Sequence, residues 1–237
     1  MRQIATLLIL AISGCVTVET TNNTSENTFN PKERAEARIA LGMGYLEQGN
    51  MLKARENFEK ALNHSPGYYR AQLSMAHYFE KVGETSSAEK MYKTSLRQHP
   101  KNGNVLNNYG TFLCKQGDYS AADKYFNSAI QQPYYYLISG SYENAALCAL
   151  KAGNTQQAKN YFIRTLDHDP NRINSVLRLA KLEIDDGEYT QARIRLMKLH
   201  QSYGLQKPSL RLLIELEEKA GNHILEQQYR DKLAKLS

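Results

Sequence analysis

One glycine recurs along this chain at an almost constant spacing, and that spacing limits the possible folds more than any other feature. The recurring residues are Gly49, Gly83, Gly117, Gly153, Gly187 and Gly221. Neighbouring members are 34 residues apart, except at the third interval, which is 36 residues long. A period of this length predicts a stack of similar units, in which each unit buries its apolar face against the next.

Residues 107–135 show what one unit contains. Gly117 separates two segments, and Asp118 directly after it is expected to cap the second one. Apolar residues in the second segment recur at the i, i+4 and i+7 positions of an amphipathic helix. These are Ala122, Phe126 and Ala129, and the small Gly110 in the first segment would allow close approach around Phe126. The unit is therefore expected to be two antiparallel helices.

Helix–turn–helix units with a 34-residue period are the signature of the tetratricopeptide repeat. The sequence predicts an all-α superhelix of six such repeats, with about twelve helices whose first members line a concave groove. The repeats are expected near residues 35–68, 69–102, 103–136, 139–172, 173–206 and 207–237, in a domain that spans residues 31–237. The last two repeats depart from the consensus sequence. This is expected at the end of the array, because the outer face of a terminal repeat is exposed to solvent.

The long interval places two additional residues near the junction of the third and fourth repeats. Three consecutive tyrosines, Tyr134, Tyr135 and Tyr136, lie there after Pro133. They could form an exposed aromatic contact for a partner. The favoured interpretation is that they wedge the widened junction between the two repeats.

The first residues of the chain belong to no repeat. Residues 4–12 form an apolar run that is too short to span a bilayer and follows a positive charge at Arg2. The small residues Ser13 and Gly14 then precede Cys15, an arrangement that resembles a bacterial lipobox. An ordinary secretory signal beside an unrelated cysteine is the alternative.

The lipobox interpretation predicts how the front of the chain is organised. Residues 1–14 would be a lipoprotein signal peptide, and Cys15 would carry the lipid. Residues 15–30 are rich in Thr and Asn and would form a flexible tether. Val16 stands where Asp usually signals retention at the inner membrane, so a lipid anchor on the periplasmic face of the outer membrane is favoured.

The composition argues against several classes of function. The chain has 30 basic and 24 acidic residues, interspersed rather than grouped into the basic stripe that nucleic-acid binding requires. The histidines are His64, His77, His99, His168, His200 and His223, and they are spread over several repeats. They are not expected to converge on one metal or catalytic base. We therefore expect no enzyme, no cofactor, no small-molecule substrate and no nucleic-acid partner.

Two cysteines remain if Cys15 is lipidated. Cys114 and Cys148 lie one repeat apart, both on the first helices of their repeats. In an oxidising compartment they could form a disulfide. They could equally be two small buried thiols.

Two groups of residues are candidates for a partner-binding groove. In the first repeat Ile39, Met43 and Leu46 form an apolar stripe, which either receives a partner segment or is covered by the tether or a neighbouring helix. In repeats three to five the corresponding face carries Asn107, Asn108, Asn144 and Arg178. Asn side chains can pair with both polar groups of a bound peptide backbone. These positions could also simply be solvated.

Asn108, Asn144 and Arg178 occupy the same position in three successive repeats. This set resembles part of the carboxylate clamp of chaperone-binding tetratricopeptide domains. The remaining clamp positions hold Asn107, Thr111 and Asn174 in place of Lys, Asn and Lys. The chain therefore departs from the full clamp, and a C-terminal carboxylate ligand is not expected.

Together these features resemble the type IV pilus biogenesis lipoproteins, the PilF/PilW-type pilotins. The most specific part is the run N-x-Y-G-x-F-L-C-x-x-G at residues 107–117, followed by A-x-x-x-F-x-x-A-x-x-x-P-x-Y at residues 122–135. The resemblance implies an outer-membrane lipoprotein that binds secretin subunits and promotes their localisation and multimerisation. It also implies a cysteine in each of repeats three and four, which favours the Cys114–Cys148 disulfide. A periplasmic adaptor for peptidoglycan enzymes or outer-membrane protein assembly is the alternative function.

Overall fold

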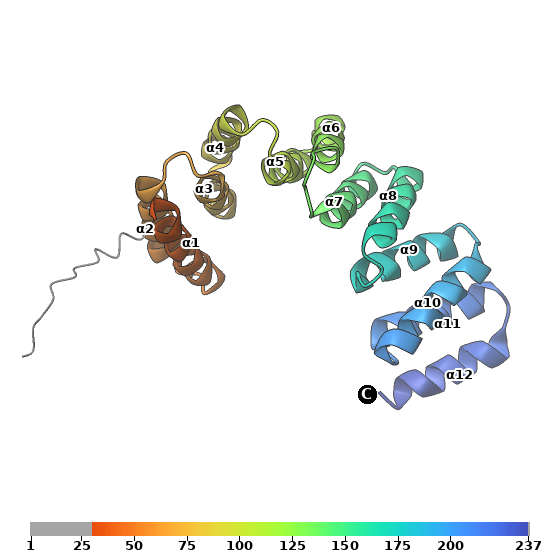
Figure 1. The fold of residues 1–237 in the computed structure, drawn as a ribbon. Helices are drawn as coiled ribbons and strands as arrows, with labels where there is room; N and C mark the ends of the chain where they lie inside the picture. The colour runs from red at the N-terminus through yellow and green to blue at the C-terminus, as the bar shows by residue number, and fades with distance from the viewer. Residues whose placement is uncertain (1–29, 237) are drawn as a thin grey trace, which may run out of the picture. The chain divides into compact units, whose positions relative to one another are not determined.

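The computed structural model describes residues 30–236 of the chain (Figure 1). The chain divides into two units, Met1–Asn30 and Pro31–Ser237, and every helix described belongs to the second. The expected signal peptide at residues 1–14, the lipidated Cys15 and residues 15–29 of the tether lie outside the described residues.

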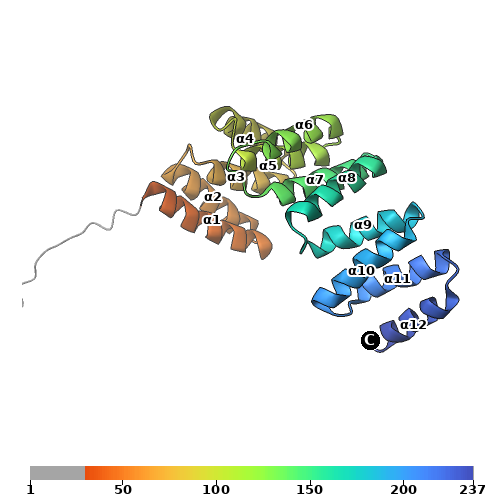
Figure 2. The ribbon, with the colours of Figure 1, turned by 45° about the vertical axis from the view of Figure 1, so that its right-hand side comes forward.

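Within residues 30–236 the structure has twelve α-helices and no strand. They are α1 (Pro31–Glu47), α2 (Met51–His64), α3 (Tyr69–Lys81), α4 (Thr85–Gln98), α5 (Gly103–Lys115), α6 (Tyr119–Ile130), α7 (Ile138–Lys151), α8 (Thr155–His168), α9 (Ile173–Asp185), α10 (Tyr189–Tyr203), α11 (Lys207–Lys219) and α12 (His223–Ala234). Each odd-numbered helix packs on the even-numbered helix after it, and Figure 2 shows these pairs lying beside one another along the chain. The predicted all-α stack of six repeats is confirmed.

The turns inside the repeats explain the glycine period. All six recurring glycines have a positive φ, between 75° and 85°. Residues with a Cβ are strained in this left-handed conformation, whereas glycine adopts it freely. The helix that follows is often capped by a side chain, as at Asp118, whose carboxylate accepts from the Ala121 backbone N–H at 3.1 Å.

In the first and third repeats, the core pairs a small residue of the first helix with a large residue of the second. Phe126 on α6 is buried against Gly110 on α5, where an added Cβ would lie 3.0 Å from the Phe126 ring. Gly42 on α1 faces Phe58 on α2 still more closely, at 2.5 Å from such a Cβ. The interlock expected around Gly110 is therefore present, and the same arrangement holds the first repeat together.

Only one of the three junction tyrosines wedges the third and fourth repeats apart. The ring of Tyr135 is buried against Gly103 at the start of α5, and its hydroxyl lies 2.9 Å from the Ser141 hydroxyl on α7. Tyr134 and Tyr136 are instead 102% and 81% exposed. The wedge interpretation is thus right for Tyr135 and wrong for its two neighbours.

Two buried carboxylates make ion pairs in the last two repeats. Glu217 on α11 is 0% exposed, and both of its carboxylate oxygens accept from the Arg193 guanidinium, at 2.6 and 2.7 Å. Burial alone would raise the pKa of Glu217, but the hydrogen bonds from Arg193 and Asn222 outweigh it and lower the pKa. Glu183 on α9 makes the same two-pronged contact with Arg195. The Arg193–Glu217 pair links repeats five and six, and the Arg195–Glu183 pair links the two helices of repeat five.

The odd-numbered helices form a continuous surface across the repeats. α3, α5 and α7 lie on one side of the stack, and α4, α6 and α8 lie on the other (Figure 1). We call the first side the odd-helix face, because α1, α3, α5 and α7 contact one another in turn along it. Within residues 30–236, none of the helices has the length and apolar character needed to cross a membrane.

Candidate protein-binding groove

Three cavities follow one another along the odd-helix face, where the groove was predicted. The first, of about 510 Å³, lies over α1, α3 and α5. The second, of about 440 Å³, lies over α5, α7 and α9. The third, of about 430 Å³, lies between α7 and α9 and shares Leu147 and Arg178 with the second. A row of neighbouring cavities along one helical face can receive an extended polypeptide segment.

The first cavity mixes apolar and polar side chains, and Arg70 brings one cation to its lining. Its lining includes Met43, Leu73, His77, Asn108, Tyr136 and Leu137. Burial lowers the pKa of His77, so its imidazole is neutral at neutral pH. Tyr136 and Leu137 reach this cavity from the lengthened junction before α7, which explains why they are exposed while Tyr135 is not.

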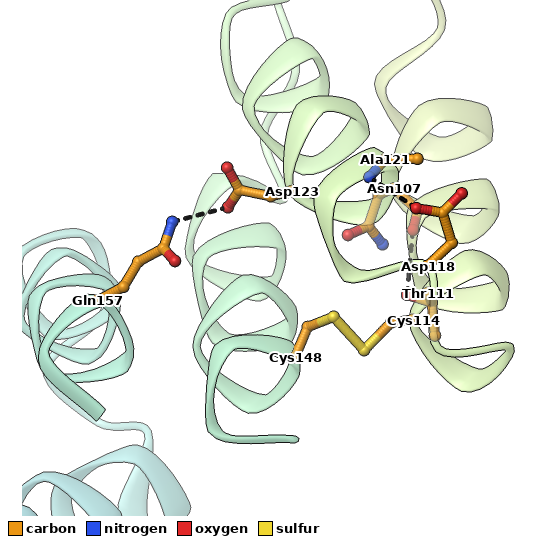
Figure 3. Close-up of a disulfide and its surroundings, with 8 residues drawn as sticks. All are labelled: Asn107, Thr111, Cys114, Asp118, Ala121, Asp123, Cys148 and Gln157. Carbon is orange, nitrogen blue, oxygen red and sulfur yellow. Dashed lines mark hydrogen bonds between the residues drawn. A yellow bond between two sulfur atoms is a disulfide. The ribbon is translucent and has the colours of Figure 1, made fainter. Parts of the chain in front are cut away.

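The second cavity is built around a disulfide. The sulfur atoms of Cys114 on α5 and Cys148 on α7 are bonded, and the two Cα atoms are 5.8 Å apart (Figure 3). Both cysteines line the cavity, together with Asn144 and Arg178 from the predicted groove set. The bond joins two neighbouring repeats, so it holds this part of the odd-helix face in one arrangement.

Four of the predicted groove residues, Met43, Asn108, Asn144 and Arg178, line these cavities. Asn107 does not, because its side chain connects α5 to α7. Its amide oxygen accepts from the Ser141 hydroxyl at 3.0 Å and from the Asn144 amide at 3.1 Å. Its backbone carbonyl accepts from the Thr111 hydroxyl (Figure 3). The assignment of Asn107 to the groove surface is therefore corrected: it positions Asn144 rather than facing a ligand.

The apolar stripe of the first repeat is also corrected. Ile39 is 5% exposed and packs in a cluster with Ala61 of α2 and Ala71 of α3. Leu46 is 8% exposed and packs against Phe58. Both side chains are covered because α2 and α3 close over them. Of the three stripe residues, only Met43 remains at the surface of the groove.

Several groove residues were missed by sequence reasoning. Leu73 and His77 lie 34 residues after Ile39 and Met43, so they occupy the equivalent positions of the second repeat. The repeat register could therefore have predicted them as groove residues. Tyr136 was considered only in the alternative interpretation of the junction, as an exposed aromatic contact, and it lies in the two-residue insertion where the register breaks. Lys151 closes α7, and nothing in its local sequence distinguishes it from a solvated terminal lysine.

A further cavity, of about 690 Å³, lies away from the odd-helix face. It is formed mainly by α8 and α10 and includes the exposed Ile163 and Ile194.

No group of three or more His, Cys, Asp or Glu side chains among the described residues could hold a metal ion. The groove instead presents apolar, amide and cationic side chains, such as Leu147, Asn144 and Arg178.

This architecture defines the class of protein. Tetratricopeptide repeat models match residues 35–68, 91–124 and 149–204. The first of these ranges coincides with the first repeat expected from the glycine period. The chain is thus a tetratricopeptide-repeat protein, a class that serves as a scaffold for protein–protein interaction.

Comparison with whole proteins identifies the family within this class. The chain is 33% identical over 210 residues to the type IV pilus assembly protein PilF of Pseudomonas aeruginosa. This match covers 89% of this chain and 83% of PilF. The solved structure of Pseudomonas aeruginosa PilF superposes with a TM-score of 0.72 at 32% identity, covering 87% of this chain and 93% of PilF. The chain belongs to the PilF family of tetratricopeptide-repeat proteins.

A second solved structure shares the fold. PilW, described as a widely conserved type IV pilus biogenesis factor, superposes with a TM-score of 0.70 at 24% identity. The match covers 84% of this chain and 91% of PilW. The fold of this chain is therefore shared with both of these solved structures.

Proposed function

We propose that this chain is a pilotin of the type IV pilus, an outer-membrane lipoprotein that binds secretin subunits and promotes their localisation and multimerisation. The observation that carries the proposal is the similarity to PilF, which runs through 89% of the chain rather than through a few repeats. Generic repeat positions would account for a shared fold but not for such an extended match.

The odd-helix face supplies the binding surface in this proposal. A secretin segment that is exposed before multimerisation would lie along it, with its apolar side chains over Met43, Leu73 and Tyr136 in the first cavity. Met43 and Leu73 lie on helices that pack in the repeat core, and Tyr136 follows the buried Tyr135. A surface that is already ordered loses little conformational entropy when a partner binds.

The lipid anchor would determine where in the cell the chain acts. Acylation of Cys15 would hold the chain at the periplasmic face of the outer membrane, and residues 16–29 would let the repeat domain reach subunits nearby. Fourteen flexible residues correspond to an r.m.s. reach of about 20 Å. The chain acts in this scheme through binding alone, without catalysis, cofactor or small-molecule substrate.

Heat- and detergent-resistant secretin multimers in cells test the proposal. We would compare their amount and membrane location in cells that lack this chain and in cells restored with wild type or with Cys15→Ala. Loss of multimers, rescued by wild type and mislocated with Cys15→Ala, is the expected result. Normal multimers in the deletion strain would contradict the proposal. Copurification with peptidoglycan enzymes or outer-membrane assembly components would then favour the adaptor function.

A further inference from the structure

The second cavity of the odd-helix face has an unbalanced charge. Three cations line it: Lys115 at the end of α5, Lys151 at the end of α7 and Arg178 on α9. No acidic residue is among the side chains that line it. The cavity therefore presents positive charge to anything that enters it.

Two of these cations have no counter-charge within the described residues. Lys115 pairs with Glu80 at 2.7 Å, whereas the exposed Lys151 and Arg178 make no ion pair in this part of the chain. Other cations on neighbouring helices are neutralised, for example Arg172, which contacts Glu143 at 2.5 Å. Lys151 and Arg178 thus remain available to a partner.

The floor between these cations is apolar. It consists of the Cys114–Cys148 disulfide and Leu147, with the buried ring of Phe126 beneath. At its edge, the Asn144 amide nitrogen donates to Asn107, which leaves the Asn144 amide oxygen to accept from a peptide N–H. Positive charge, an apolar floor and a side-chain acceptor for a peptide N–H thus occur together in about 440 Å³.

We propose that this cavity binds a short acidic and apolar segment of the partner protein, with a carboxylate between Lys151 and Arg178 and an adjacent apolar side chain on the disulfide floor. The inference rests on the proposed function, because it names the chemistry of the secretin segment. The carboxylate belongs to an Asp or Glu side chain within the segment, since the full terminal-carboxylate clamp is not present. Charge pairs of this kind steer association and select the partner.

Binding of peptides to the purified full-length chain tests this inference. The probes are twelve-residue peptides tiled across the secretin of the same cells, a designed peptide that alternates Asp and Leu, and its isostere with Asn in place of Asp. We expect the tightest tiles to place Asp or Glu beside an apolar residue, and the Asp peptide to bind more tightly than the Asn peptide. Added salt should weaken this binding, because exposed charges are screened.

Charge reversal supplies the matched comparison. The double variant Lys151→Glu/Arg178→Glu should weaken binding of the Asp peptide by at least about tenfold. Lys124→Glu makes the same kind of charge change at an exposed lysine on α6, outside the cavity, and should change binding by less than about twofold. Equal binding of the Asp and Asn peptides, or equal binding by wild type and the double variant, would overturn the inference.

The two proposals fail in different ways. If secretin tiles do not bind but the Asp peptide still depends on Lys151 and Arg178, the cavity is an acidic-segment site and the secretin assignment is wrong. If secretin multimers depend on the chain but not on Lys151 and Arg178, the pilotin function stands and the cavity assignment is wrong. Failure of every acidic peptide to bind also contradicts the cavity assignment.

Discussion

The ring of Tyr135 lies directly against the backbone of Gly103, so closely that a Cβ on Gly103 would fall 2.4 Å from the ring. This contact fills the junction that the two inserted residues open between the third and fourth repeats. The neighbouring tyrosines do not take part in this contact and are exposed. Tyr136 and the following Leu137 line the first cavity of the groove. The insertion therefore serves both the core and the binding surface.

Gly103→Ala should destabilise the repeat domain, because the new methyl group has to displace a buried ring. Overpacking of this kind typically costs about 1–3 kcal/mol in the free energy of unfolding. Gly44→Ala is the matched control, since an added Cβ there meets nothing within 4 Å. Gly44 lies inside α1, so alanine should stabilise the helix by up to about 1 kcal/mol. Thermal unfolding followed by circular dichroism would show the opposite signs; a lower midpoint for both variants would contradict this account.

Tyr136→Ala and Tyr134→Ala separate binding from stability. Both side chains are exposed, so neither variant should lower the unfolding midpoint appreciably. Only Tyr136 lines the first cavity, and truncation of an aromatic contact residue commonly costs about 1–2 kcal/mol of binding free energy. Secretin binding by purified protein should therefore weaken about tenfold for Tyr136→Ala and stay unchanged for Tyr134→Ala. Equal effects would place the partner elsewhere.

Reduction of the Cys114–Cys148 bond should lower the thermal midpoint of the domain. The two cysteines are 34 residues apart, and closing a loop of that length stabilises by about 3–4 kcal/mol in the chain-entropy model. The double variant Cys114→Ser/Cys148→Ser should resemble the reduced wild type and should not respond to reductant. A midpoint that is the same with and without reductant would show that packing alone holds the two repeats.

Acid should weaken the last two repeats. The pKa of Glu217 is lowered in the folded chain, so its stabilising contribution is present above its ordinary pKa of 4.5 and is lost as the pH falls through the lowered value. Glu217→Gln should be less stable than wild type at pH 7, by about 1–3 kcal/mol, and the difference should shrink towards pH 3. Glu218→Gln, at a neighbouring side chain that is 63% exposed, should show little effect at either pH. A constant difference for Glu217→Gln across this range would contradict the assignment.

The repeat period was sufficient to predict the helix pairs because it reflects a backbone requirement. A positive φ after each first helix is needed in every repeat, and glycine meets that need at Gly117 as at Gly49. The interlock of Gly110 with Phe126 was predictable for a similar reason, since small and large residues must alternate where two helices approach closely.

The groove was less predictable, because one helix face serves two purposes. Ile39, Met43 and Leu46 look alike in a sequence, yet only Met43 reaches the surface once α2 and α3 have packed. Asn107 and Asn108 are likewise adjacent and identical in type, but the first bonds to α7 and the second faces a cavity. These outcomes depend on neighbouring repeats, which local sequence does not describe.

Binding of a partner protein on the odd-helix face can be tested by the secretin multimer yield in cells carrying Met43→Asp. Leu52→Asp is the control, since Leu52 lies in the same repeat on α2, is 69% exposed and lines none of the three groove cavities. Both variants are compared at equal abundance and after their unfolding midpoints are measured. Cells with Met43→Asp should lose most of the multimers, whereas cells with Leu52→Asp should keep them. Wild-type multimer levels with a folded Met43→Asp protein would contradict it.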